Sequence, residues 1–136
     1  NVNDESCSSH FMQYGAVAGL RGDQSEPQAI LAELEARRNA AVAGLNAIEG
    51  VTSYTPESTF YLFPNVTELA KRKGLMDYEE FRRAALHATG VSFTNRLHFG
   101  RVQPGESERY IRLAYSGISV ADIEEGLAKL KDWAEA

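Results

Sequence analysis

The sequence predicts an α+β fold, in which a small mixed or antiparallel β-sheet is covered on one face by helices and a long linking helix lies near the N-terminus. Apolar residues recur at helical spacing in four segments of the 136-residue chain. Short runs rich in aromatic and β-branched residues lie between the later helices. Because these strand-like runs are few and not consecutive, we expect one small sheet packed against a helical layer.

The first predicted helix runs from about Ser9 to Leu20 and is closed by Gly22. Its apolar residues occupy most of its circumference: Phe11, Met12, Ala16, Val17, Ala18 and Leu20. A helix that is apolar on most sides needs burial on most sides. A chain of this length does not readily supply so much cover, so the pattern indicates that part of the surroundings of this helix is missing.

The second helix is predicted from about Glu26 to Glu49, with Gly50 at its end. Ser25 and Gln28 have the spacing of a capping box. One face of the helix carries an apolar stripe at helical spacing: Ile30, Leu34, Ala41, Leu45 and Ile48.

Two shorter helices follow. One spans about Tyr78 to Ala88 and is capped by Asp77, and the other spans about Val120 to Glu135 and is capped by Ser119. The buried stripe of the last helix consists of Ile123, Leu127, Leu130 and Trp133.

The strand-like runs are Thr59 to Phe63, Val91 to Phe99 and Tyr110 to Tyr115. The first stops at Pro64, and Val51 to Tyr54 is a candidate edge strand.

Composition excludes several classes of function. The net charge is −5 and the cations are scattered, which disfavours a nucleic-acid partner. No apolar run approaches the roughly 20 residues of a membrane span, so no membrane association is expected. Cys7 is the only cysteine, without metal-ligand spacing around it, so we expect no disulfide, no metal site and a reducing, cytoplasmic location.

Arg112 is the strongest candidate for a functional side chain. Side chains alternate across a strand, so Ile111 and Leu113 would share the helix-covered face and Arg112 would point to the other face. A cation in mid-strand between apolar neighbours needs an anion or water. A guanidinium matches a carboxylate through two parallel hydrogen bonds. From the residues alone two other interpretations stay open: an arginine on an exposed face, or one paired with a glutamate of a neighbouring strand.

Several motifs resemble, in order, the C-terminal small domain of fold-type I aminotransferases of class I/II, the group similar to aspartate aminotransferase. The stretch from Gly105 to Tyr115 resembles a late strand of that family, and the following helix has its Ile-x-x-Gly-Leu-x-x-Leu pattern. Thr59 to Pro64 and the segment from Gly90 to Gly100 resemble two further family elements. The loop from Thr94 to Leu97 departs from the family because it lacks the usual Pro-Gly.

The resemblance implies that Arg112 binds the α-carboxylate of an amino-acid or 2-oxo-acid substrate. It also implies pyridoxal 5'-phosphate as the cofactor and a homodimer in the intact enzyme. Residues 1–22 would belong to the large domain, and residues 23–136 would form the small domain. The candidate residues of a substrate loop are His98, Phe99 and Gly100. Ser6 and Ser8 are candidates for the cofactor phosphate across a dimer, although capping of the first helix accounts for them as well.

The cofactor lysine of that family lies in a Ser-x-x-Lys loop, which this sequence does not contain. Its four lysines, Lys71, Lys73, Lys129 and Lys131, all lie in charged contexts. The family's other cofactor-binding residues belong to an N-terminal large domain that this sequence lacks. We therefore expect the chain alone to be inactive and to bind no cofactor.

Two other functions stay open beside that of an aminotransferase fragment. The same domain could sense a ligand in an aminotransferase-like transcription regulator, which would need a basic DNA-binding segment upstream. A free-standing interaction module is the other alternative, against which the apolar circumference of the first helix argues. The three histidines, His10, His87 and His98, are dispersed and have no metal-ligand spacing.

Overall fold

A computed structural model describes residues 9–136 of the chain, which divides into two compact units between Ala32 and Glu33. The first unit contains helix α1 (His10–Arg21) and the beginning of helix α2 (Ser25–Asn46). The remainder of α2 belongs to the second unit. The predicted division into residues 1–22 and 23–136 follows the aminotransferase resemblance and stays a prediction.

Helix α1 has no buried residue, although most of its side chains are apolar. The large apolar side chains exposed on it are Phe11, Met12, Tyr14, Val17 and Leu20. The helix therefore matches its predicted position and leaves an apolar surface of the kind that globular proteins normally cover.

The start of α2 differs from the predicted capping box. Ser25 lies inside the helix, and its hydroxyl donates to the Asp23 carboxylate at 2.6 Å, while its backbone N–H donates to the other carboxylate oxygen at 3.0 Å. Asp23 is thus the acceptor that Ser25 was expected to be. These hydrogen bonds from Ser25 lower the pKa of Asp23.

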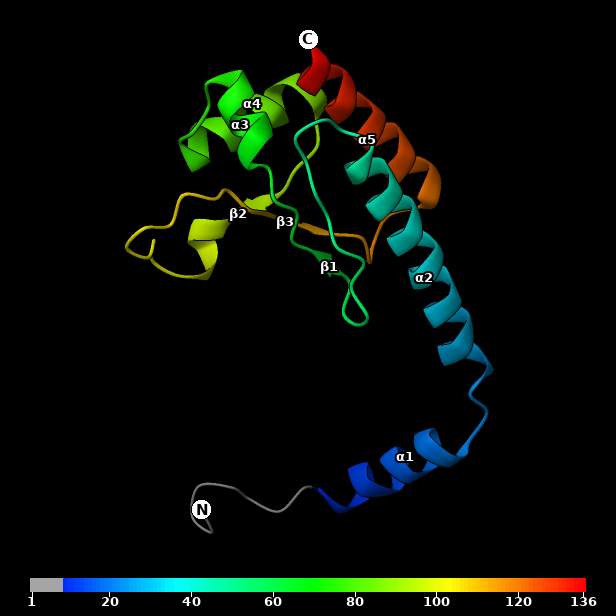
Figure 1. Ribbon diagram of the computed structural model, residues 1–136. Helices are drawn as coiled ribbons and strands as arrows, with labels where there is room; N and C mark the ends of the chain where they lie inside the picture. The colour runs from blue at the N-terminus through cyan, green and yellow to red at the C-terminus, as the bar shows by residue number, and fades with distance from the viewer. Residues whose placement is uncertain (1–8) are drawn as a thin grey trace. The chain divides into compact units, whose positions relative to one another are not determined.

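The second unit contains a three-stranded sheet and four helical segments besides α2. In chain order the elements are β1 (Tyr61–Leu62), α3 (Thr67–Lys73), α4 (Tyr78–Thr89), β2 (Thr94–Asn95), the 3₁₀ helix η1 (Arg96–Phe99), β3 (Ile111–Ala114) and α5 (Val120–Glu135). Helices α3, α4 and α5 lie to one side of the strands (Figure 1).

The sheet is antiparallel, with β3 between β1 and β2. Tyr61 pairs with Ala114, and Thr94 pairs with Arg112, so the two edge strands meet β3 at different points along its length. The α+β prediction is confirmed, but the strands are much shorter than predicted. The predicted edge strand at Val51 to Tyr54 is reduced to a single bridge between Thr52 and Asn65.

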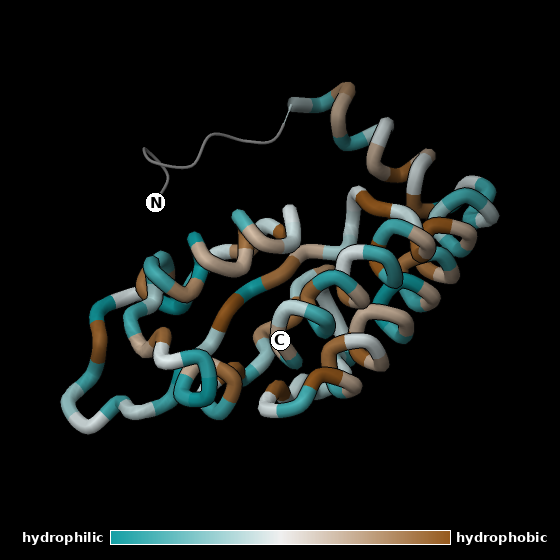
Figure 2. The backbone as a smooth tube through the Cα atoms, turned by 90° about the horizontal axis from the view of Figure 1, so that it is seen from above, coloured by the Kyte–Doolittle hydropathy of each residue, from teal (hydrophilic) through white to brown (hydrophobic). Residues whose placement is uncertain are grey.

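The core lies between the helices and the sheet face that carries Ile111 and Tyr115. Its most deeply buried large side chains are Leu45, Ile48, Leu62, Leu69, Ile111 and Pro64. Hydrophobic and hydrophilic residues alternate along the helical turns of the chain (Figure 2), a pattern that in α4 and α5 accompanies one buried face. The predicted stripes of α2 and α5 enter this core, except that Ile30 of α2 is exposed.

The caps predicted for α4 and α5 are confirmed. The Asp77 carboxylate accepts from the backbone N–H groups of Glu79 and Glu80, at 2.9 and 3.0 Å. The Ser119 hydroxyl accepts from the Asp122 N–H at 3.2 Å. Helix α3 was not predicted, and it ends at Gly74, whose φ of 68° is a left-handed conformation that suits glycine.

Gly44 and Gly126 lie in helices, but the space around them differs, so replacing each with alanine should have opposite effects on the stability of the fold. A Cβ on Gly44 would lie 2.6 Å from Leu127 Cδ1, whereas a Cβ on Gly126 would meet Val91 Cγ2 at an ordinary 3.5 Å. Gly44→Ala should therefore destabilise the fold by about 1–3 kcal/mol through overpacking. Gly126→Ala should stabilise it by about 0.5–1 kcal/mol, because alanine favours a helix interior. Urea denaturation measures both, and an equal effect of the two changes would contradict close packing of α2 on α5.

Candidate functional site

Arg112 lies on the central strand, on the sheet face that the helices do not cover. Its neighbours Ile111 and Leu113 point into or against the core, which confirms the predicted alternation. The Arg112 side chain is half-buried although the helices α3, α4 and α5 lie on the other side of the strands (Figure 1). Other side chains of the sheet and its loops must therefore provide its cover.

Two aromatic rings provide that cover. The guanidinium carbon of Arg112 lies 4.3 Å from the centroid of the Tyr61 ring and 4.2 Å from the centroid of the Phe99 ring. Contacts of this kind stabilise a cation through the negative faces of the rings. They do not use the five N–H donors, which lie in the plane of the guanidinium.

Those donors have no acceptor within residues 9–136. Among these residues the Arg112 side chain forms neither an ion pair nor a hydrogen bond, so the described residues include no glutamate partner on a neighbouring strand. A half-buried guanidinium with vacant donors favours an external anion with planar geometry, such as a carboxylate.

Two more rings extend the aromatic surface beside Arg112. Phe63 stacks on Tyr110 with their centroids 5.2 Å apart and their planes 3° from parallel, and it meets Phe99 edge-on at 6.3 Å. We call Tyr61, Phe63, Phe99 and Tyr110 the aromatic face. Phe63 and Phe99 are each 45% exposed, so this surface is open to a ligand.

The candidate substrate-loop residues take different positions. Phe99 ends η1 and contacts Arg112, as described above. His98 instead turns toward Asn95, whose side-chain oxygen lies 3.0 Å from its Nδ1 atom. Gly100 follows η1 and its carbonyl accepts from Arg96 at 3.0 Å. The structure thus brings Phe99, but not the imidazole of His98, into contact with the arginine.

An ion pair that the sequence analysis did not identify fastens the loop that contains Phe99. Arg96 Nη2 lies 2.8 Å from Glu106 Oε2, and both side chains are mostly buried, at 19% and 15% exposure. Arg96 also donates to the carbonyl of Arg101 at 3.1 Å. The only signal for this ion pair in the sequence was that the loop from Thr94 to Leu97 lacks the Pro-Gly expected from the resemblance.

The Glu106 carboxylate accepts two further hydrogen bonds. It accepts from the backbone N–H of Gln103 at 3.1 Å and from the Tyr78 hydroxyl at 3.2 Å. These hydrogen bonds, together with the charges of Arg96 and Arg109, lower the pKa of Glu106. Burial, followed by the bond to Glu106, raises the pKa of Tyr78.

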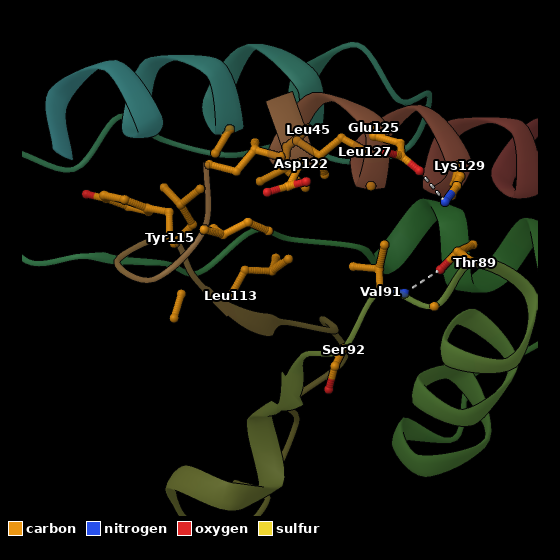
Figure 3. Close-up of a pocket in the computed structure, with 17 residues that line it drawn as sticks. Leu45, Thr89, Val91, Ser92, Leu113, Tyr115, Asp122, Glu125, Leu127 and Lys129 are labelled. Carbon is orange, nitrogen blue, oxygen red and sulfur yellow. Dashed lines mark hydrogen bonds and ion pairs between the residues drawn. The ribbon is translucent and has the colours of Figure 1, made fainter. Parts of the chain in front are cut away.

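A cleft of about 500 Å³ lies on the other side of the sheet, between α2, α5 and the segment 89–92 (Figure 3). Its wall is largely apolar, with Leu45, Leu113 and Leu127 among its side chains. Its charged rim includes Glu125 and Lys129, which pair with each other at 2.6 Å. These two charges satisfy each other, so the aromatic face around Arg112 is the better candidate for recognition of a charged ligand.

The four lysines all have partners that fit a surface role. Lys71 pairs with Glu68, Lys129 with Glu125 and Lys131 with Glu135, while Lys73 lies over the ring of Trp133. A lysine that binds a cofactor covalently must be a free amine in an enclosed site. None of these lysines meets that requirement, so the residues of this chain do not fit covalent attachment of pyridoxal 5'-phosphate.

Ser6 and Ser8, like Cys7, lie outside the described residues. His10 packs edge-on against Tyr14 with their centroids 5.0 Å apart. Within residues 9–136 no three histidine, cysteine or acidic side chains gather as a metal site would require. None of the helices in the same range combines the length and apolar character needed to cross a membrane.

Comparisons with known proteins point to one family. No protein-family model matches the chain. The aspartate aminotransferase of Bacillus subtilis is 33% identical over 123 residues, which cover 90% of this chain and 30% of that protein. An alanine aminotransferase from Pyrococcus furiosus superposes on 90% of the chain with a TM-score of 0.75 and 25% identity, and the match covers 29% of it. A putative aminotransferase from Clostridium difficile, described as bound to pyridoxal phosphate, superposes with a TM-score of 0.66 at 22% identity. This match covers 82% of the present chain and 26% of the Clostridium difficile chain. The chain spans about a third of the length of these proteins.

The hydrogen bonds of Glu106 predict its titration. A carboxyl whose pKa is lowered in the folded state stabilises the fold above its ordinary pKa of 4.5, and that contribution is lost as the pH falls through the lower folded value. A carboxyl-carbon NMR titration should therefore give Glu106 a midpoint below 4.5. Tyr78→Phe, which removes one donor, should move the midpoint upward. A midpoint at or above 4.5 in the unaltered protein would contradict this hydrogen-bond network.

Proposed function

The chain is a part of the aminotransferase fold, and we propose that it provides the substrate-carboxylate site of an aminotransferase that uses pyridoxal 5'-phosphate. Arg112 would bind the α-carboxylate, and the aromatic face would form one wall of the substrate site. The observation that supports this proposal most is the guanidinium of Arg112, which contacts the rings of Tyr61 and Phe99 while its N–H donors have no acceptor in residues 9–136.

The geometry of Arg112 suits a carboxylate in particular. Two aromatic rings lie within 4.3 Å of the guanidinium carbon and exclude water from that part of its surface, while its N–H donors stay available to a ligand. A carboxylate at these donors accepts two parallel hydrogen bonds, which fix the orientation of the bound molecule as well as its position. Charge-assisted hydrogen bonds are also stronger where neighbouring rings exclude water.

One carboxylate site serves both substrates of a transaminase. An L-amino acid and a 2-oxo acid each have a carboxylate next to the carbon at which the amino group is exchanged. Arg112 would hold either molecule with that carbon at the same distance from the guanidinium. Its contribution to the rate is then orientation, because it does not itself transfer a proton or the amino group.

The cofactor would be held by other parts of the enzyme, because no lysine of this chain is suited to attach it. When bound, pyridoxal phosphate supplies the electron sink for amino-group transfer. We further propose that residues 1–22 associate with a large domain, that residues 23–136 act as the small domain, and that the intact enzyme is a cytoplasmic homodimer. The exposed apolar side chains of α1 support such an association.

The role of Arg112 predicts a specific kinetic defect. In the intact protein, Arg112→Ala should raise the KM for the amino-acid substrate by on the order of 10–100-fold, because it removes charge-assisted hydrogen bonds. Arg112→Lys should recover only part of the loss, since a lysine cannot bind a carboxylate through a planar fork.

Arg101→Ala is the matched control, because Arg101 is an exposed arginine of the loop that contains Phe99 and its side chain forms no hydrogen bond or ion pair within residues 9–136. It should leave KM unchanged. Equal KM values for the Arg112→Ala variant and the unaltered enzyme would refute the carboxylate role.

The isolated 136-residue chain should be inactive. Because its lysines are paired or stacked, it should not retain pyridoxal phosphate through gel filtration. Cofactor absorbance that co-elutes with the isolated chain, together with measurable amino-group transfer, would show that this expectation is wrong.

A further inference from the structure

The loop from residue 96 to residue 106 contains Phe99, one of the two rings that cover Arg112. Apart from the two residues at its ends, every residue of this loop is exposed. Leu97 and Val102 are 44% and 53% exposed, so the loop has no apolar anchor of its own. Besides the contacts of the Phe99 ring with Phe63 and Arg112, polar contacts within the loop therefore hold Phe99 in place.

Arg96 and Glu106, the two ends of the loop, make most of those contacts. The Arg96 guanidinium donates to the carbonyls of Gly100 and Arg101 and pairs with Glu106. Glu106 in turn accepts from the backbone N–H of Gln103, and its own N–H donates to the Gln103 carbonyl at 3.0 Å. One ion pair thus ties both ends of the loop to its middle.

The loop is also joined to the helical layer through this pair. The Tyr78 hydroxyl of α4 lies 3.2 Å from the Glu106 carboxylate and 3.1 Å from the Glu108 carbonyl, so these two acceptors share its single proton. Tyr78 is itself buried, at 7% exposure, and Arg109 lies over its ring at 4.9 Å. Glu106 therefore connects the exposed loop 96–106 to helix α4.

We propose that the Arg96–Glu106 ion pair is a latch that positions Phe99 over Arg112, so that Arg96 and Glu106 are positioning residues for the carboxylate site. The latch rests on the proposed function of Arg112. Without it, Phe99 leaves the guanidinium, water reaches the uncovered face, and the arginine binds a carboxylate less tightly. Neither latch residue touches the substrate.

The test compares Arg96→Met with Arg101→Met in the intact protein. Both changes remove one positive charge from the same loop, but only Arg96 has partners there. Arg96→Met and Glu106→Gln should each raise the KM for the amino-acid substrate roughly tenfold with a smaller change in kcat, because they misplace a binding group. Arg101→Met should leave KM unchanged.

A second measurement separates positioning from general stability. In an Arg112→Ala background, Arg96→Met should raise KM no further, because the latch acts only through Arg112. Amide hydrogen exchange should become faster at Leu97, Gln103 and Glu106 in the Arg96→Met variant and stay unchanged in helix α5. If Arg96→Met does not fold, Glu106→Gln, which preserves side-chain volume, takes its place in both measurements.

The outcomes distinguish the two proposals. An unchanged KM in the Arg112→Ala variant would refute the proposed function. It would also refute the role of the latch in carboxylate binding. If Arg112→Ala raises KM but Arg96→Met behaves like Arg101→Met, the latch alone is wrong. A full additional rise of KM when Arg96→Met is combined with Arg112→Ala would also overturn the latch.

Discussion

The feature on which the site depends is a cation in the middle of a sheet, for which residues 9–136 supply no counter-charge. Desolvation disfavours the Arg112 guanidinium unless something compensates it. Contacts with the faces of Tyr61 and Phe99 supply part of that compensation and leave the N–H donors unused. The position of β3 makes this possible, because β1 on one side contributes Tyr61 and the 3₁₀ helix η1, which follows β2 on the other side, contributes Phe99.

The two rings are supported in different ways. Tyr61 lies on β1, whose other residue, Leu62, is buried in the core. Phe99 lies in a 3₁₀ turn on an exposed loop, where its contact with Phe63 is supplemented by the ion pair between Arg96 and Glu106. The Tyr61 ring is therefore fixed by the core of the fold, whereas the position of the Phe99 ring depends in part on polar contacts that a single substitution can remove. This asymmetry makes the loop the adjustable part of the site.

Local signals were enough to predict the fold class and the helices α1, α2, α4 and α5, but not α3 or η1. Asp77 and Ser119 cap α4 and α5 as expected, because a cap depends on residues a few positions apart. The alternation of side chains along β3, which predicted the sheet face of Arg112, is an equally local signal. Strand lengths were overestimated, since aromatic and β-branched residues also occupy η1 and the segments beside the strands. The contact of Phe99 with Arg112 and the pairing of Arg96 with Glu106 were not predicted, because they depend on how a loop folds back over the sheet.

The most direct test of the account is an NMR titration of the arginine Nε–Hε groups of the intact protein with a 2-oxo acid. Arg112, identified by the signal lost in the Arg112→Lys variant, should shift in a saturable way as the carboxylate occupies its vacant donors. Arg96, already bonded within its loop, should shift much less. An Arg112 signal that stays in place while the substrate saturates the enzyme would contradict the central claim.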